Sequence, residues 1–197
     1  MTGRQKLLKL ASLLLDYPDE ERGRLLGECE RLARSLAAGD GRDLLGRFLR
    51  EIRTMPQAEL AAHYSEIFDF HEENALYLTF HEAGEGSERA RLLLDLKGRA
   101  REAGYEVPED ELPDYLPLLL ELLAVRPKSG DDLAPRVGRC VGRLTANLAR
   151  AKSPYRFLLA AAGTVLPTSG EAGGLAPPAA RSAAEDDVPY PLHHAQS

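Results

Sequence analysis

Three histidines lie within one short region of the chain, and histidines grouped in this way could bind a metal ion. They are His63, His71 and His81, and the same region carries the carboxylates Glu66, Glu72, Glu73 and Glu82. Imidazole and carboxylate together form a common ligand set for zinc. However, no H-E-x-x-H motif is present, and the spacings do not place two imidazoles on one helical face. We therefore expect no metal site and no cofactor, and keep a metal-dependent enzyme using these histidines as an alternative.

A glycine-rich stretch, Gly84 to Ser87, could in principle hold a nucleophile or a phosphate group. The serine nucleophile of hydrolases lies in G-x-S-x-G after a strand, and this stretch has neither that order nor a preceding strand. The dinucleotide fingerprint fails as well, because Arg89 stands where a third glycine is needed. The stretch is interpreted as a loop followed by a helix cap, and the chain is expected not to be an enzyme.

Aromatic and acidic residues are concentrated in the middle of the chain. Eight of the 12 Phe and Tyr residues fall in this region, namely Phe48, Tyr64, Phe68, Phe70, Tyr77, Phe80, Tyr105 and Tyr115. Carboxylates accompany them at Glu106, Glu109, Asp110, Glu111 and Asp114. Taken singly, aromatic residues at helical spacing are typical of a core and an acidic run is typical of a solvated loop. Together they are what a groove for an amphipathic basic peptide requires.

The elements that must position these residues are predicted to be helices. Apolar residues recur at helical spacing, and proline, glycine and capping residues separate the segments. The expected helices span about 6–15, 19–38, 44–52, 56–68, 88–103, 114–124, 133–148 and 154–162. Residues 76–80 are interpreted as a helical turn, because no partner strand is evident. The fold class is therefore all-α, a single-domain bundle of about seven to nine helices spanning residues 1–166.

The composition limits where the chain works and what it binds. A tail at 167–197 is rich in Pro, Gly and Ala and is predicted to be disordered. The formal net charge of −6 disfavours nucleic-acid binding. No apolar run is long enough to span a membrane, and Lys6 and Lys9 interrupt the N-terminal apolar stretch, which argues against a secretory signal. Cys29 and Cys140 lie in amphipathic patterns, as buried thiols would in a reducing compartment. We expect a cytoplasmic protein that is not membrane-embedded.

Four segments of the sequence resemble one known family when taken in order. They are LLKLASLLLDYP at 7–18, HYSEIFDF at 63–70, LYLTFHEAGEGSERARLLLDLKGRAREAGYE at 76–106 and ELPDYLPLLLELL at 111–123. The chain resembles the NarJ family of nitrate reductase molybdenum cofactor assembly chaperones, which is related to the TorD-like redox enzyme maturation proteins. TorD-like proteins have a histidine after the aspartate of the last segment, where this chain has Tyr115. The match is therefore to the nitrate reductase branch.

The resemblance implies a helical binding protein without catalytic turnover. Its implied partner is the N-terminal peptide of the catalytic alpha subunit of respiratory nitrate reductase, together with the apo alpha–beta complex. Such a chaperone holds the apoenzyme until bis-molybdopterin guanine dinucleotide is inserted, and prevents premature membrane docking. A helical adaptor for an unrelated client is a further alternative.

Carried over to this sequence, the peptide-binding residues come from two elements. Tyr64, Phe68 and Asp69 form the first, and Glu111, Pro113, Asp114 and Tyr115 form the second. Leu119 is added on physical grounds, as part of the apolar surface that a client helix would bury. In this prediction Tyr64, Phe68, Tyr115 and Leu119 contact apolar side chains, while Asp69, Glu111 and Asp114 face the client's cations.

Overall fold

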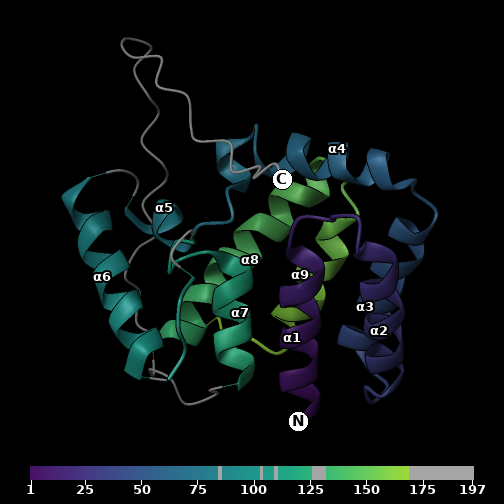
Figure 1. The fold of residues 1–197 in the computed structure, drawn as a ribbon, viewed down its shortest axis with the longest axis horizontal. Coiled ribbons are helices and arrows are strands. Elements are labelled where there is room, and N and C mark those ends of the chain that lie inside the picture. The colour runs from purple at the N-terminus through teal and green to yellow at the C-terminus, as the bar shows by residue number, and fades with distance from the viewer. Residues whose placement is uncertain (84–85, 103, 109–110, 126–131, 169–197) are drawn as a thin grey trace.

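The computed structural model describes residues 1–83, 86–102, 104–108, 111–125 and 132–168, and in these ranges helices joined by loops make up the fold (Figure 1). The helices are α1 (Gly3–Leu15), α2 (Arg22–Arg34), α3 (Asp40–Arg53), α4 (Gln57–Phe68), the 3₁₀ helix η1 (Glu72–Asn74), α5 (Leu78–Ala83), α6 (Ser87–Glu102), α7 (Leu116–Val125), α8 (Leu133–Arg150) and α9 (Tyr155–Gly163). The predicted all-α bundle is confirmed. The predicted tail lies outside the described residues from position 169 onwards.

Helix α1 illustrates how local sequence sets the helix ends. Thr2 Oγ1 accepts a hydrogen bond from the backbone N–H of Gln5 at 3.2 Å, and Gln5 Oε1 accepts one from the N–H of Thr2 at 2.7 Å. This reciprocal pair is a capping box, which satisfies two N–H groups that the first turn leaves unpaired. The helix ends at Leu15, before Asp16 and Pro18, as the proline predicted.

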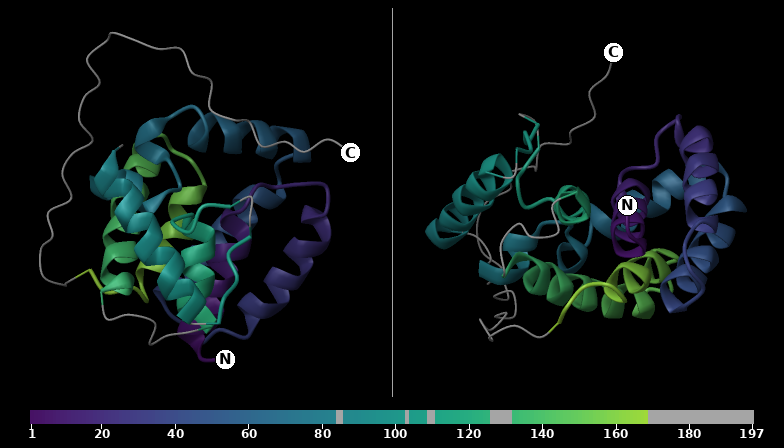
Figure 2. Two further views of the ribbon diagram at one scale, coloured as in Figure 1. Left: turned by 60° about the vertical axis from the view of Figure 1, so that its left-hand side comes forward. Right: turned by 90° about the horizontal axis from the view of Figure 1, so that it is seen from below.

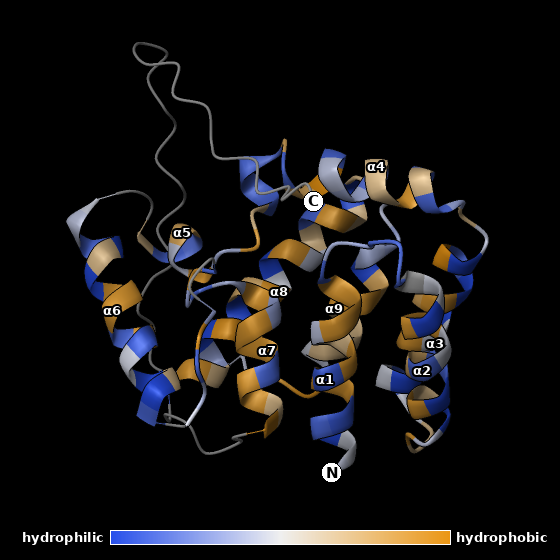
Figure 3. Ribbon diagram, in the orientation of Figure 1, coloured by the Kyte–Doolittle hydropathy of each residue, from blue (hydrophilic) through white to orange (hydrophobic). Residues whose placement is uncertain are grey.

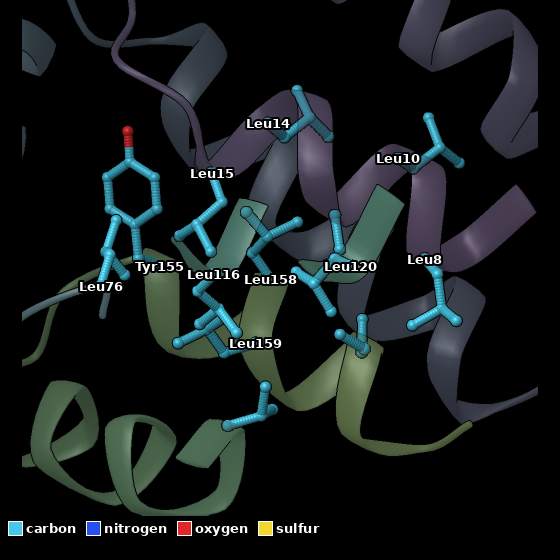
Figure 4. Packing of buried hydrophobic residues seen from close by; sticks show 14 of the residues in the cluster. Leu8, Leu10, Leu14, Leu15, Leu76, Leu116, Leu120, Tyr155, Leu158 and Leu159 are labelled. Carbon is cyan, nitrogen blue, oxygen red and sulfur yellow. The ribbon is translucent and has the colours of Figure 1, made fainter. Parts of the chain in front are cut away.

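The core forms where α1, α7 and α9 meet. Helix α7 is apolar around most of its circumference, and all but two of its ten residues are buried (Figure 3). It packs against α1, while α9 contacts α1, α3 and α8. Leucines from the three helices interdigitate there, among them Leu8, Leu116 and Leu158, each fully buried (Figure 4). A helix that is apolar around most of its surface is stable only when other elements cover it, and α1 and α8 contribute to that cover.

The two cysteines lie in the core as predicted. Cys29 and Cys140 are free, buried thiols. Burial raises the pKa of Cys29 to about 11 and that of Cys140 to about 12, because a thiolate is poorly solvated in apolar surroundings. Both thiols are therefore protonated and unreactive in the folded protein.

Residues 76–80 form the beginning of a helix and also a β-bridge, whereas the sequence indicated only a helical turn. A helix does begin at Leu78, as expected, but Tyr77 also forms an antiparallel β-bridge with Tyr115. The N–H of Leu78 donates to the carbonyl of Asp114 at 2.9 Å, and the N–H of Leu116 donates to the carbonyl of Leu76 at 2.7 Å. The expected helical turn is therefore found from Leu78 onwards, and the bridge between Tyr77 and a loop residue is an addition to it. The partner is non-local and loop-like, so residue periodicity could not reveal it.

The bundle has different elements at its two sides. Helix α6 lies at one edge and contacts α5, whereas α2 and α3 lie side by side at the other edge (Figure 2). Within the described ranges, no helix has the length and apolar character needed to cross a bilayer.

Gly138 provides a test of the packing between α8 and the end of α9. A Cβ at this position would lie 2.1 Å from the carbonyl oxygen of Pro167, a backbone atom that cannot move alone. Gly138→Ala is therefore expected to lower the free energy of unfolding by about 1–3 kcal/mol. Gly142→Ala on the same helix meets nothing within 4 Å and should raise it by up to about 1 kcal/mol. Urea denaturation of both variants measures the difference, and equal effects would contradict this packing.

Candidate functional site

The ends of two helices and the beginnings of two others lie close together on one side of the bundle. Asp16 and Tyr17 follow α1, Asp69 and Phe70 follow α4, Tyr77 precedes α5, and the 111–115 loop leads into α7. In Figure 1 the end of α1 and the beginning of α7 lie on the side of the bundle that α4 crosses. The two sequence elements predicted to bind a peptide, 64–69 and 111–115, are therefore brought together by the fold.

Tyrosine rings connect these elements. The ring of Tyr64 lies 5.5 Å from that of Tyr17 in an edge-on arrangement and 4.8 Å from that of Phe68. The hydroxyl of Tyr64 donates to the carbonyl of Leu15 at 3.1 Å, so α4 is tied to the end of α1. Contacts of this kind fix ring positions and add about 0.5–1.5 kcal/mol per aromatic pair beyond apolar burial.

Tyr115 links the buried Tyr64 to residues at the surface. Its ring lies 5.6 Å from that of Tyr77, and its hydroxyl lies 3.4 Å from that of Tyr64. The Tyr115 hydroxyl also donates to Asp16 Oδ1 at 3.3 Å. Burial, and then the nearby carboxylate of Asp16, raise the pKa of Tyr115 well above its usual range. The hydroxyl is therefore a neutral donor at any physiological pH.

The eight predicted site residues divide into an interior and a surface group. Five are buried in the core or just beneath the surface, namely Tyr64, Phe68, Pro113, Asp114 and Leu119. The other three, Asp69, Glu111 and Tyr115, are exposed or half-buried. In this arrangement the interior group shapes the surface from beneath, whereas the surface group is within reach of a partner.

Asp114 is the most constrained of the eight, with a fully buried side chain. Its Oδ2 accepts hydrogen bonds from the hydroxyl of Thr79 and, at 3.2 Å, from the N–H of the same residue. Arg89 on α6 lies with Nη2 at 3.8 Å from Oδ2, and its Nε donates to Thr79 Oγ1 at 3.1 Å. One carboxylate thus joins the start of α7 to α5 and α6. It does not face solvent, where it was expected to meet a client's cations.

The pKa of Tyr77 is influenced by carboxylates from both predicted site segments, 64–69 and 111–115. Burial raises the pKa of Tyr77 to about 12, and the carboxylates of Glu111, Asp114 and Asp69 contribute in that order. Carboxylates from both elements therefore lie within electrostatic reach of one phenol ring. Among the described residues, neither Asp69 nor Asp16 forms an ion pair.

Exposed apolar side chains accompany these carboxylates. Phe70 is 74% exposed, and Leu112 and Tyr17 are each about two-fifths exposed. Single exposed apolar residues are common, but here they alternate with carboxylates on adjoining loops. We call this surface the acidic–aromatic face and define it as Asp16, Tyr17, Asp69, Phe70, Tyr77, Glu111, Leu112 and Tyr115.

Sequence reasoning placed three of these eight in the site and left five outside it. Tyr77 and Phe70 belonged to the aromatic concentration in the middle of the chain, so a signal for them was present. Asp16 and Tyr17 lay in the first segment of the family resemblance but were interpreted only as the end of a helix. Their proximity to Tyr115 depends on the packing of α1 against α7, which no local pattern encodes.

The three histidines do not converge on a common point. His63 Nε2 lies 2.9 Å from Ser153 Oγ, His81 is buried with Nε2 at 2.7 Å from the carbonyl of Ala75, and His71 is exposed. Over the residues that the structure describes, no group of three or more His, Cys, Asp or Glu side chains could hold a metal ion. The geometry therefore gives no support to the metal-dependent enzyme. Of the glycine-rich stretch, residues 84 and 85 lie outside the described residues, and Ser87 begins α6.

The buried His81 and the half-buried His63 predict a loss of stability in mild acid. Burial lowers the pKa of His81 and of His63 below the usual 6.5. The unfolded state then binds more protons, so stability is complete above pH 6.5 and falls as the pH drops toward the folded-state pKa. The loss is at most about 1.4 kcal/mol per imidazole for each pH unit. His81→Gln keeps a donor for the carbonyl of Ala75 and does not titrate, so unfolding free energies between pH 7.5 and 5.5 should show a shallower slope. An unchanged slope would contradict a neutral buried His81.

Comparison with known proteins shows which family the sequence matches. Residues 33–161 match the family described as nitrate reductase delta subunit. The chain is 32% identical over 193 residues to the nitrate reductase molybdenum cofactor assembly chaperone NarJ of Escherichia coli (strain K12), which covers 94% of this chain and 79% of that protein. It is 37% identical over 123 residues to the probable NarJ chaperone of Bacillus subtilis (strain 168), covering 62% and 67%.

A further relative is a larger protein, of which only a part matches this chain. The nitrate reductase-like protein NarX of Mycobacterium tuberculosis (strain ATCC 25618 / H37Rv) is 35% identical over 152 residues, which make up 77% of this chain but 23% of that protein. The family match spans well over half of the chain, and the resemblance seen in the sequence is confirmed. The chain belongs to the nitrate reductase delta subunit family, as the match at residues 33–161 and the identity to NarJ show.

Proposed function

We propose that this protein is a cytoplasmic assembly chaperone that binds the N-terminal segment of the catalytic alpha subunit of a respiratory nitrate reductase. It holds the apoenzyme, as the subunit alone or as the apo alpha–beta complex, while the molybdenum cofactor is inserted, and it prevents premature docking to the membrane. Membership of a family whose relatives in Escherichia coli and Bacillus subtilis are named as nitrate reductase molybdenum cofactor assembly chaperones carries this proposal.

The acidic–aromatic face supports a basic, amphipathic client segment. Phe70, Leu112 and Tyr17 offer exposed apolar surface, and Asp69 and Asp16 offer carboxylates without ion-pair partners among the described residues. Burial of apolar side chains at about 25 cal/mol per Å² would provide most of the affinity. The carboxylates would mainly steer the encounter and set the register of the client.

The interior residues are proposed to support this face. Tyr64, Phe68, Pro113, Asp114 and Leu119 keep the site role predicted for them, but as positioning residues. Tyr64, for example, contacts both Tyr17 and Tyr115, so its loss would leave two residues of the face without support. Substitution of such a residue would alter client affinity only by displacing the residues of the acidic–aromatic face that it supports.

Co-purification tests the choice of client. The full chain, tagged and expressed in nitrate-respiring cells, is expected to retain the nitrate reductase alpha subunit, and deletion of that subunit's N-terminal segment should abolish retention. Retention of an unrelated protein in its place, with no alpha subunit, would support the adaptor alternative and contradict the proposal. Isothermal titration with a synthetic peptide of the same segment then gives the affinity of the isolated contact.

A further inference from the structure

A groove with basic walls is lined by residues of α2 and α3, the two helices at the edge of the bundle opposite α6 (Figure 1). Its volume is about 530 Å³, and its lining residues are Glu30, Ala33, Arg34, Arg42, Asp43, Gly46, Leu49, Arg50 and Arg53. Four arginines against two carboxylates give this groove a net positive charge, although the whole chain carries −6. The groove is therefore a local reversal of the protein's charge.

Two of the four arginines are without partners. Arg42 donates to the carbonyl of Leu36 at 3.3 Å, and Arg53 pairs with Glu30 at 3.4 Å. Within the described part of the chain, Arg34 and Arg50 form neither a hydrogen bond nor an ion pair, and both are exposed. Guanidinium groups bind carboxylates through paired N–H donors, so these two can take up an anionic ligand without breaking an existing bond.

The lining also indicates which kind of anion fits. Ala33 and Leu49 provide an apolar floor, and Glu30 and Asp43 add carboxylates to the same lining as the arginines. A compact polyanion would meet repulsion from those carboxylates. A peptide that combines spaced carboxylates with apolar side chains can avoid them and cover the floor. The chemistry of the groove therefore favours an acidic peptide with apolar residues beside its charges.

This chain contains such a peptide. Residues 185–192 read Glu-Asp-Asp-Val-Pro-Tyr-Pro-Leu, three successive carboxylates followed by apolar and aromatic side chains. They lie outside the described residues. We propose that this segment of the chain's own tail is the occupant of the groove between α2 and α3, with Glu185, Asp186 and Asp187 at the arginines and Val188 or Tyr190 over the apolar floor.

The length of the tail permits an intramolecular contact. Pro167 lies against Gly138 on α8, because a Cβ at Gly138 would lie 2.1 Å from the carbonyl oxygen of Pro167. Three residues earlier, Thr164 lies beside Gly41 in the first turn of α3, which supplies one wall of the groove. The 17 residues from Thr168 to Glu185 can extend over about 56 Å. This is longer than α3, which has 14 residues and is about 21 Å long, so the segment at 185–192 can reach the groove.

Tethering makes even a weak contact significant. A short linker that can reach the site gives the tethered segment an effective concentration of about the mM range. A contact with a dissociation constant of about 1 mM would then be occupied in about half of the molecules. A separate acidic protein would have to compete with this tethered segment for the groove. The proposal is independent of the client assigned to the acidic–aromatic face.

The full-length ¹⁵N-labelled protein provides the test. In Glu185→Lys/Asp186→Lys/Asp187→Lys, the amide signals of Arg34, Gly46 and Arg50 are expected to move, while those of α7 remain in place. Raising NaCl from 0.02 to 0.5 M should move the wild-type signals toward the variant positions, because salt screens the contact. Glu171→Lys, a charge change in the same tail but outside the segment, is the matched control and should leave the groove signals unchanged.

A charge exchange completes the design. Arg34→Glu/Arg50→Glu combined with the triple lysine substitution should restore a salt-sensitive contact that neither set of substitutions shows alone. Wild-type groove signals identical to those of the triple variant at low salt would overturn the proposal. So would groove signals that move only when an acidic peptide from another protein is added, since the groove would then serve a separate partner.

Discussion

Replacing Asp114 with alanine is expected to lower the free energy of unfolding by about 3 kcal/mol, because one member of a buried charge pair is removed. The carboxylate is fully buried and accepts hydrogen bonds from the N–H and hydroxyl of Thr79. Without it, Thr79 loses its acceptor and Arg89 its counter-charge, and both groups are largely inaccessible to water. The value is at the low end for such pairs because Arg89 remains 23% exposed.

The measurement is equilibrium denaturation in urea, with Asp69→Ala as the control. Asp69 is exposed and forms no ion pair among the described residues, so its replacement should change stability by less than about 0.5 kcal/mol. Asp114→Asn keeps an acceptor for the N–H of Thr79 and should fall between wild type and Asp114→Ala. If Asp114→Ala were as stable as Asp69→Ala, the carboxylate would not connect α5, α6 and α7 as described.

Reversing two charges on the acidic–aromatic face is expected to have the largest effect on client binding. Asp69→Lys/Glu111→Lys should weaken the alpha-subunit peptide by about 10–100-fold, mostly through slower association, since complementary charges at a rim steer encounter. The dependence on salt should also change sign, from weaker binding at high salt to stronger binding. Folding stability should change little, because exposed ion pairs contribute at most about 1 kcal/mol.

Glu28→Lys/Glu102→Lys is the matched control for this variant. It changes the net charge by the same amount, and both residues are exposed on helices that do not contribute to the face. Association and dissociation rates are measured by surface plasmon resonance at two salt concentrations. If the control weakened binding as much as the double variant on the face, the effect would come from net charge and the assignment of the site would be wrong.

Some of the predicted site residues are buried and others are exposed, and this division shows what could be predicted from the sequence and what could not. Helices and their apolar faces could be predicted because Leu45, Phe48, Leu49 and Ile52, like the matching positions elsewhere, recur at the period of a helix. The burial of Cys29 followed from the same pattern. Periodicity identifies which face of a helix is apolar, but it does not say which aromatic residues another element covers.

Asp114 and Leu119 show the consequence of that limit. Leu119 was predicted to contact a client, but the leucine is fully buried in the core. Asp114 was expected to face a cation of the client, and it faces Thr79 and Arg89 of this chain. In both cases the deciding neighbours come from segments 25 or more residues away, and a short sequence motif contains no information about them.

By itself the sequence determined the helical class, the family and the two chain segments that form the candidate site. These depend on local spacing and on the order of motifs along the chain. Only the tertiary structure decided that α1 brings Asp16 and Tyr17 to that site, and that Tyr77 joins its two segments through Tyr115. It also brought together the arginines of α2 and α3 in one groove. Exposure and proximity arise from packing between distant segments, and packing exists only in the folded chain.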